Sequence, residues 1–270
     1  MTNSRSALAK QFRELHVPGT PVVVGNAWDA ASAAALAAAG FAAIATTSGG
    51  VAWTNGVPDG NRISREAMLR SVDQMLAVLD LPLSVDIEAG LSVEPSDVAA
   101  LAGELAKREV AGLNLEDSWD GALLPISSQC ERLAAVRKSS GPMFLNARVD
   151  TFLIGVGDDR AKVKEASVRA AAFVDAGADG IFVPGVADFD QIRELVSRIN
   201  VPLNIMTGPG GPTVLALADS GVARVSLGTA LAEAAYSRAY DLALQLRDSV
   251  SVPATHPTLS YPILNGLLTR

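Results

Sequence analysis

Short apolar runs alternate along this chain with longer stretches in which apolar residues recur at helical spacing. The apolar runs span residues 22–26, 42–48, 83–88, 112–117, 143–150, 180–185, 203–207 and 224–228. The helical stretches between and after them span residues 29–39, 65–79, 94–109, 128–137, 159–176, 188–199, 212–219 and 229–246. Near-continuous apolar strands that alternate with helices predict a parallel sheet covered on both faces.

The number of repeats decides between two architectures. Eight strand–helix units in 270 residues favour a closed (β/α)₈ TIM barrel within the α/β class. The alternative, an open Rossmann-like sheet, lacks the Gly-x-Gly-x-x-Gly turn that would follow its first strand. We therefore predict one barrel domain over residues 1–270. Gly40, Gly112, Gly177 and Gly221 are expected to end helices with positive φ. Residues 251–270 are expected either to contact a neighbouring subunit or to cap the barrel.

Composition narrows the class of partner. Hydrophobic residues make up 49% and charged residues 19% of the chain, which is typical of a globular protein. The formal net charge is −7 and no segment is strongly basic, which argues against nucleic acids and anionic membrane surfaces as partners. No apolar run is long enough to span a bilayer, and the opening residues lack a signal-peptide core. With Cys130 as the one cysteine, we expect a cytoplasmic protein without intramolecular disulfides.

Polar residues gather where the apolar runs end, which is where a barrel carries its chemistry. The third run ends with Asp86 and Glu88, the fourth with Glu116 and Asp117, and the fifth contains Arg148. Asp86 and Glu88 are expected to share one face of their strand, because residues two apart do so. Carboxylates from neighbouring strands would then converge on one point.

Converging carboxylates repel one another unless a cation lies between them. Oxygen ligands without histidine or cysteine indicate Mg²⁺, with Mn²⁺ as the other possibility. We expect Asp86 to bind the metal directly and Glu88 and Glu116 to act through water. Arg148 is expected to bind the carboxylate of a small substrate. The opposing interpretation is that these acids form salt bridges with Arg148 and close the barrel mouth.

Further polar positions complete the expected substrate site. The turn formed by Thr47, Ser48, Gly49 and Gly50 is expected to bring backbone amides close to a substrate oxyanion, although a plain tight turn fits the same residues. Residues 55–60 form a glycine-rich loop that is either a lid or an ordinary surface loop. Asn204, in the seventh run, is also assigned to substrate binding.

Missing residue types exclude several reaction classes. All five lysines fall in helical stretches, so no strand end offers one for a Schiff base. The two histidines, His16 and His256, lie near the termini, which argues against a histidine-based triad or a zinc hydrolase. Cys130 lies in a helical stretch and is expected to be a packing residue.

A series of short motifs resembles the isocitrate lyase/phosphoenolpyruvate mutase superfamily over nearly the whole chain. The motifs are GNAWD at 25–29, TSG at 47–49, GVPD at 56–59, VDIEAG at 85–90, NLED at 114–117, NARVD at 146–150 and GADG at 177–180. The resemblance implies a Mg²⁺ enzyme that stabilises the enolate of a pyruvate-like acid while a C–C or P–C bond is made or broken. It implies a barrel whose last helix is swapped between subunits, giving dimers or tetramers in which the helical region 229–270 lies at the subunit interface.

By position, the resemblance assigns the metal to Asp86, with Glu88 and Glu116 in its water shell, and the substrate carboxylate to Arg148. It assigns the oxyanion and carboxylate cradle to residues 48–50, and it makes Asp59 the aspartate of a gating loop. The resemblance is incomplete after the fourth strand. Lyases of the superfamily carry a Lys-(Lys/Arg)-Cys-Gly-His loop there, whereas residues 118–126 read SWDGALLPI.

The leading hypothesis is a Mg²⁺-dependent lyase or decarboxylase that cleaves a C–C bond of a small 2-hydroxy or 2-oxo carboxylate. One alternative is phosphoenolpyruvate or phosphonopyruvate P–C chemistry. The other is a barrel that binds a 2-oxo acid without turning it over.

Overall fold

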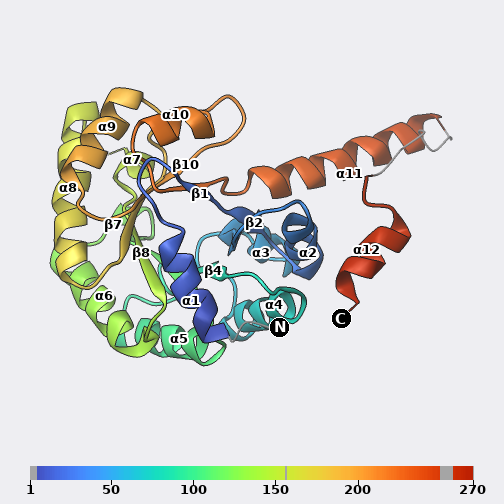
Figure 1. Ribbon diagram of the computed structural model, residues 1–270, viewed down its shortest axis with the longest axis horizontal. Helices are drawn as coiled ribbons and strands as arrows, with labels where there is room; N and C mark the ends of the chain where they lie inside the picture. Colours follow the sequence, from blue (N-terminus) through green and yellow to red (C-terminus); the bar gives the residue numbers. More distant parts are fainter. Residues whose placement is uncertain (1–4, 156, 250–257, 270) are drawn as a thin grey trace.

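The computed structural model describes residues 5–155, 157–249 and 258–269 (Figure 1). Its main sheet has nine parallel segments in the order β1-β11-β10-β9-β8-β5-β4-β3-β2. They are β1 (Val22–Val23), β2 (Gly25–Ala27), β3 (Ile44–Thr46), β4 (Leu83–Asp86), β5 (Gly112–Glu116), β8 (Phe144–Arg148), β9 (Gly180–Val183), β10 (Leu203–Met206) and β11 (Arg224–Ser226). Each segment overlaps one of the eight predicted runs; β1 and β2 share the first run, and β2 ends one residue beyond it.

Those two segments close the barrel. β1 pairs with β11, whereas β2 pairs with β3 on the other side. Between them, the Val24 N–H donates to the carbonyl of Val225 (3.0 Å) and the Gly25 N–H donates to that of Ala43 (3.2 Å). The first strand therefore changes partner at Val24, and the sheet closes on itself. This confirms the predicted TIM barrel.

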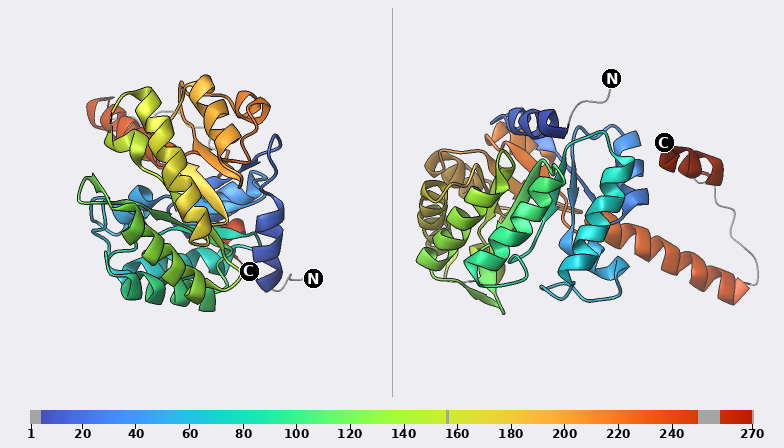
Figure 2. Two further views of the ribbon diagram at one scale, coloured as in Figure 1. Left: turned by 90° about the vertical axis from the view of Figure 1, so that its left-hand side faces the viewer. Right: turned by 90° about the horizontal axis from the view of Figure 1, so that it is seen from below.

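Helices surround the strands in two further views of the molecule (Figure 2). They are α1 (Arg5–Glu14), α2 (Ala30–Ala38), α3 (Ser48–Thr54), α4 (Arg65–Val78), α5 (Pro95–Lys107), α6 (Ile126–Ser140), α7 (Thr151–Ile154), α8 (Asp159–Asp175), α9 (Phe189–Arg198), α10 (Val214–Asp219), α11 (Ala230–Ser249) and α12 (Tyr261–Leu268). None of these helices, within the described ranges, is long and apolar enough to cross a membrane.

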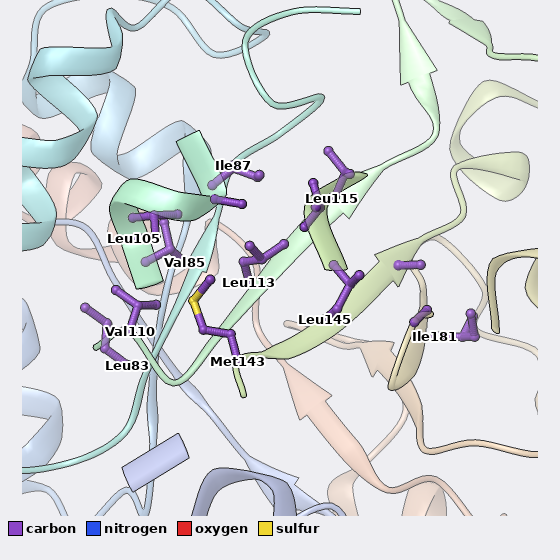
Figure 3. Close-up of a cluster of buried hydrophobic side chains, with 14 of the residues drawn as sticks. Leu83, Val85, Ile87, Leu105, Val110, Leu113, Leu115, Met143, Leu145 and Ile181 are labelled. Carbon is purple, nitrogen blue, oxygen red and sulfur yellow. The ribbon is translucent and has the colours of Figure 1, made fainter. Parts of the chain in front are cut away.

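Side chains alternate between the two faces of each strand, and this alternation positions the site. On β5, Leu113 and Leu115 point outward into the core between sheet and helices, where they join Leu145 of β8 and Val85 of β4 (Figure 3). The residues that alternate with these along each strand point into the barrel. One example is Ser84 of β4, whose hydroxyl lies 3.5 Å from the guanidinium of Arg224 on the opposite strand β11.

Some local features differ from the prediction. Residues 48–50 begin helix α3 instead of forming a tight turn. β6 (Ser118–Trp119) and β7 (Ala122–Leu123) form a small antiparallel hairpin that the sequence pattern did not indicate. Gly40, Gly177 and Gly221 have positive φ as predicted, but Gly112 does not, and Glu109 takes that conformation before β5.

Gly112 is explained by packing. A Cβ there would lie 2.8 Å from the Phe12 ring and 2.9 Å from the carbonyl oxygen of Phe144. Phe12 belongs to α1, which lies against the beginning of β8 at the amino-terminal end of the barrel. The missing side chain therefore lets α1 approach that end of the barrel closely.

Candidate active site

A cavity of about 130 Å³ opens at the carboxyl ends of the strands, where the sequence predicted the chemistry. Its wall has a polar side and an apolar side. The lining residues are Asn26, Thr46, Thr47, Ser48, Asp59, Asp86, Asn114, Arg148, Leu153, Phe182, Pro184, Met206, Ser226, Gly228 and Thr229.

Asp86 is the last residue of β4 and lines this cavity. Its N–H donates to the hydroxyl of Thr46 (2.8 Å), and its Oδ1 accepts from the Glu88 N–H (3.0 Å). Its Oδ2 lies 4.0 Å from Nη1 of Arg148. Burial raises the pKa of the Asp86 carboxyl, and the charge of Arg148 opposes that rise. Asp86 therefore presents a half-buried carboxylate to the cavity, with Arg148 no closer than 4.0 Å.

Arg148 ends β8 and is surrounded by acids. Its Nε and Nη2 donate to the two carboxylate oxygens of Asp150 at 2.6 and 3.1 Å. Its Nη1 lies 2.8 Å from Oε2 of Glu116. The bidentate fork expected to bind a substrate is thus occupied by Asp150, a residue that the predicted site did not include. Salt bridges with Arg148 exist, as the opposing interpretation holds, yet Arg148 still lines the cavity.

Glu116 faces Arg148 and is not among the residues that line the cavity. Burial raises the pKa of its carboxyl to about 8, although the charge of Arg148 favours ionisation. The neighbouring Asp117 points away from the site: its carboxylate pairs with Arg169 (3.1 Å) and accepts from the Asp150 N–H (2.8 Å). Of this predicted pair, Glu116 alone therefore belongs to the group around Arg148.

Glu88 lies beyond β4, so the strand alternation that was expected to place it on one face with Asp86 does not apply. β4 ends at Asp86, and Glu88 has a φ of 53° that breaks the alternation. Its buried carboxylate accepts from the N–H of Gly60 (2.9 Å) and also from that of Asn61. Burial raises the pKa of Glu88 to about 7, and the charges of Asp59 and Asp86 contribute to the rise. The loop backbone, which the sequence pattern could not place, turned this side chain.

The three acids predicted to bind or surround Mg²⁺ come only partly together. Within the described residues, no group of three or more His, Cys, Asp or Glu side chains is arranged to hold a metal ion. The charge of Asp86 nevertheless contributes to the raised pKa of Glu88 and of Glu116, so the three acids lie in one electrostatic neighbourhood. The carboxylates of Asp86 and Asp59 on the cavity wall, with further acids behind them, match the donor chemistry of Mg²⁺, which usually keeps several waters.

The first turn of α3 forms one side of the cavity. Thr47 and Ser48 line it, whereas Gly49 and Gly50 are buried behind them and do not. A Cβ on Gly49 would lie 2.9 Å from Thr229 and 3.3 Å from Oδ2 of Asp59. The glycine therefore leaves room for Asp59 beside this wall, and Asp59 lines the cavity.

Asn204 lies deeper in the barrel than expected. It is buried, its Oδ1 accepts from the Ser226 hydroxyl (3.3 Å), and it is not among the cavity-lining residues. Asn114, which was not predicted, lines the cavity and accepts from the side chain of Asn146 (2.9 Å). Alternation along β5 would have identified Asn114, since it lies two residues before Glu116. The apolar residues that line the cavity have no comparable signal in the sequence; they are Leu153, Phe182, Pro184 and Met206.

Comparison with known proteins adds independent findings. A family model described as phosphoenolpyruvate phosphomutase matches residues 12–247. The uncharacterized protein Rv1998c of Mycobacterium tuberculosis (strain ATCC 25618 / H37Rv) is 39% identical over 246 residues, which cover 91% of this chain and 92% of that protein. An oxaloacetate decarboxylase of Pseudomonas fluorescens (strain SBW25) is 31% identical over 249 residues, covering 88% of this chain and 84% of that enzyme. Among solved structures, a protein of Burkholderia cenocepacia J2315 described as a lyase/mutase has 34% sequence identity to this chain and a TM-score of 0.88. The match covers 97% of this chain and 96% of that one.

Proposed function

Because the chain belongs to the phosphoenolpyruvate phosphomutase family, within the isocitrate lyase/phosphoenolpyruvate mutase superfamily of enzymes, we propose that it is a Mg²⁺-dependent carbon–carbon lyase. Its substrate is a small 2-oxo carboxylate, and its reaction passes through a pyruvate-type enolate. Among such reactions, the site favours decarboxylation of a 2-oxo acid that carries a second carboxylate on C3. The protein is expected to act in the cytoplasm.

The preference for decarboxylation rests on the composition of the segment after β5. Residues 118–126 contain no lysine, cysteine or histidine, and the Ser118 hydroxyl at their start donates to Asp150 (2.6 Å). Cleavage of a 2-hydroxy acid must begin with removal of the hydroxyl proton, which requires a base. Decarboxylation needs no such proton transfer: the C3–C4 bond breaks, CO₂ leaves, and the electron pair forms the enolate. A site without the acid/base loop is suited to the second reaction.

The residues around the cavity fit a divalent ion. Asp86 would hold Mg²⁺ directly and Glu88 and Glu116 would act through water, and Mn²⁺ could replace it. When bound, the ion supplies positive charge beside the 2-oxo oxygen, where the negative charge of the enolate develops. Burial and neighbouring carboxylates raise the pKa of Glu88 and of Glu116, so a divalent ion nearby would favour the ionised form of both acids, which supports this fit.

The chain's own residues orient the substrate and exclude water. Arg148 lines the cavity as the cation that would meet the substrate carboxylate, and Thr47 and Ser48 line the cavity with it. Asp59 closes the mouth beside Gly49 and offers a carboxyl group that can return a proton to C3 of the enolate. The 31% identical relative named as an oxaloacetate decarboxylase supports the same reaction class.

The test is release of CO₂ and pyruvate from oxaloacetate with and without Mg²⁺, measured for the wild type and for Asp86→Ala. Because Mg²⁺ itself promotes this decarboxylation, the variant provides the matched background. We expect turnover that exceeds this background only for the wild type. Calorimetry should also show Mg²⁺-dependent oxalate binding that Asp86→Ala abolishes. Unchanged oxalate affinity in the variant would remove the metal assignment.

The same assays separate the alternatives. Turnover of phosphonopyruvate without turnover of oxaloacetate would support P–C chemistry, which the family description makes the second candidate. Oxalate binding without turnover of any tested 2-oxo or 2-hydroxy acid would support a barrel that binds the acid without reacting.

A further inference from the structure

A second cavity of about 270 Å³ adjoins the substrate cavity near the start of α11. Met206, the last residue of β10, and Thr229 line both cavities. The second cavity lies among the ends of β9, β10 and β11, which are neighbours in the barrel. Met206 therefore stands between the substrate site and additional space.

The lining of the second cavity repels anions. Glu233 is its one charged lining residue among those that the structure describes, and it accepts a hydrogen bond from the Thr229 hydroxyl. The hydroxyl of Thr207 donates to the carbonyl of Pro212 (2.6 Å). Much of the remaining wall consists of glycine, alanine, proline and aliphatic residues. A carboxylate or phosphonate entering this space would meet no cation, whereas an uncharged group would be accepted.

The orientation of the substrate follows from the two sides of the first cavity. In the proposed reaction, its carboxylate would face Arg148 and its 2-oxo oxygen would face Asp86, the residue that would hold the metal. The apolar side, formed by Leu153, Phe182, Pro184 and Met206, then faces C3. A substituent on C3 would point at Met206.

Met206 is suited to setting a size limit. A Cβ on Gly228 would lie 2.7 Å from its sulfur, so this glycine makes room for the methionine thioether. Methionine is unbranched and adjusts to the shape around it, but its volume still occupies the passage. Resting on the proposed function, we propose that Met206 determines how large an uncharged C3 substituent the enzyme accepts, and that the second cavity receives this substituent.

The experiment compares wild type, Met206→Ala and Met206→Phe on oxaloacetate and on its 3-methyl and 3-propyl derivatives. Truncation joins the cavities, so Met206→Ala should raise kcat/KM for the 3-propyl compound relative to oxaloacetate by about tenfold or more. Met206→Phe should lower the same ratio, even for the 3-methyl compound. Leu215→Ala, at an apolar residue of α10 that is 73% exposed, is the control and should leave the ratio unchanged. A ratio that does not respond to either Met206 variant overturns the proposal.

Binding measurements distinguish this failure from failure of the proposed reaction. Oxalate has no C3, so Met206→Ala should retain its Mg²⁺-dependent affinity. If oxalate binds but no acid is decarboxylated, the proposed reaction is wrong. The size limit is then tested by the binding affinities of 2-oxo acids that differ in the C3 substituent. Wild type should then prefer pyruvate to 2-oxohexanoate, and Met206→Ala should remove that preference. An equal preference in both proteins overturns the size limit.

Discussion

Burial at the amino-terminal end of the barrel changes the titration of His16. Its ring stacks on Phe144 at a centroid distance of 4.0 Å, and its Nδ1–H donates to the carbonyl of Phe12 (2.7 Å). Burial lowers the pKa of His16 to about 3, and the nearby charge of Arg224 contributes to the shift. His16 is therefore neutral at physiological pH and belongs to the packing of α1, as its place outside the predicted site indicated.

This lowered pKa makes stability depend on pH. Below its ordinary pKa of about 6.5, the unfolded chain takes up a proton on His16 that the folded chain does not. The free energy of unfolding should then fall as the pH drops from 6.5 toward 3, and this residue should contribute about 2 kcal/mol of loss by pH 5. His16→Phe removes this titrating group, so the free energy of unfolding of the variant should fall by about 2 kcal/mol less between pH 7 and pH 5. Urea unfolding of both proteins at pH 7 and pH 5 measures the difference, and an equal loss in both would contradict the assignment.

At the scale of elements, Glu88 attaches the loop between α3 and α4 to the end of β4. Its carboxylate accepts from two consecutive loop amides, those of Gly60 and Asn61. The side chain of Asn61 accepts in turn from the Ala89 N–H (3.2 Å). The loop that carries Asp59 is thereby held beside the cavity mouth.

Removing the carboxylate should loosen this loop. Hydrogen bonds to a charged group contribute about 1.5–3 kcal/mol, so Glu88→Ala should speed amide exchange at Gly60 and Asn61 on the order of tenfold to a hundredfold. The measurement belongs above pH 7, where Glu88 is ionised. Glu94→Ala, at an exposed residue whose side chain caps no helix, is the control. Exchange rates that match the wild type would show that Glu88 does not hold the loop.

At the scale of the whole molecule, α11 extends away from the barrel (Figures 1 and 2). Tyr240 of α11 is 66% exposed and Tyr261 of α12 is 82% exposed, and Leu246 and Ile263 are also exposed. Apolar surface of this kind marks contact sites between proteins. We propose that this region is the subunit interface of a homodimer or homotetramer, as the resemblance implied for residues 229–270, of which 250–257 and 270 lie outside the described residues.

Placing charge on this surface should separate the subunits. Tyr240→Glu and Tyr261→Glu, alone or together, should shift the protein toward monomers in sedimentation velocity experiments. Leu215→Glu introduces the same charge at an exposed apolar residue of α10 and should leave the assembly unchanged. A wild-type protein that sediments as a monomer at all concentrations would refute the interface.

The sequence by itself determined the barrel and much of the polar side of its cavity. Apolar periodicity is a local property, so strands, helices and the strand ends that carry Asp86, Glu116 and Arg148 could be predicted without coordinates. Even the closed sheet followed from counting eight repeats. These expectations need only the geometry of the single strand and the single helix.

Only the tertiary structure decided where several side chains point. Glu88 turns toward amides that lie 27 and 28 residues earlier in the chain. Asp150 accepts two hydrogen bonds from the guanidinium of Arg148. The backbone N–H of Asp150 in turn donates to the carboxylate of Asp117, 33 residues away. Met206 became part of a cavity wall through packing with Gly228 and strands from other parts of the chain. Such orientations depend on contacts between distant segments, and no local pattern of hydrophobic and polar residues contains them.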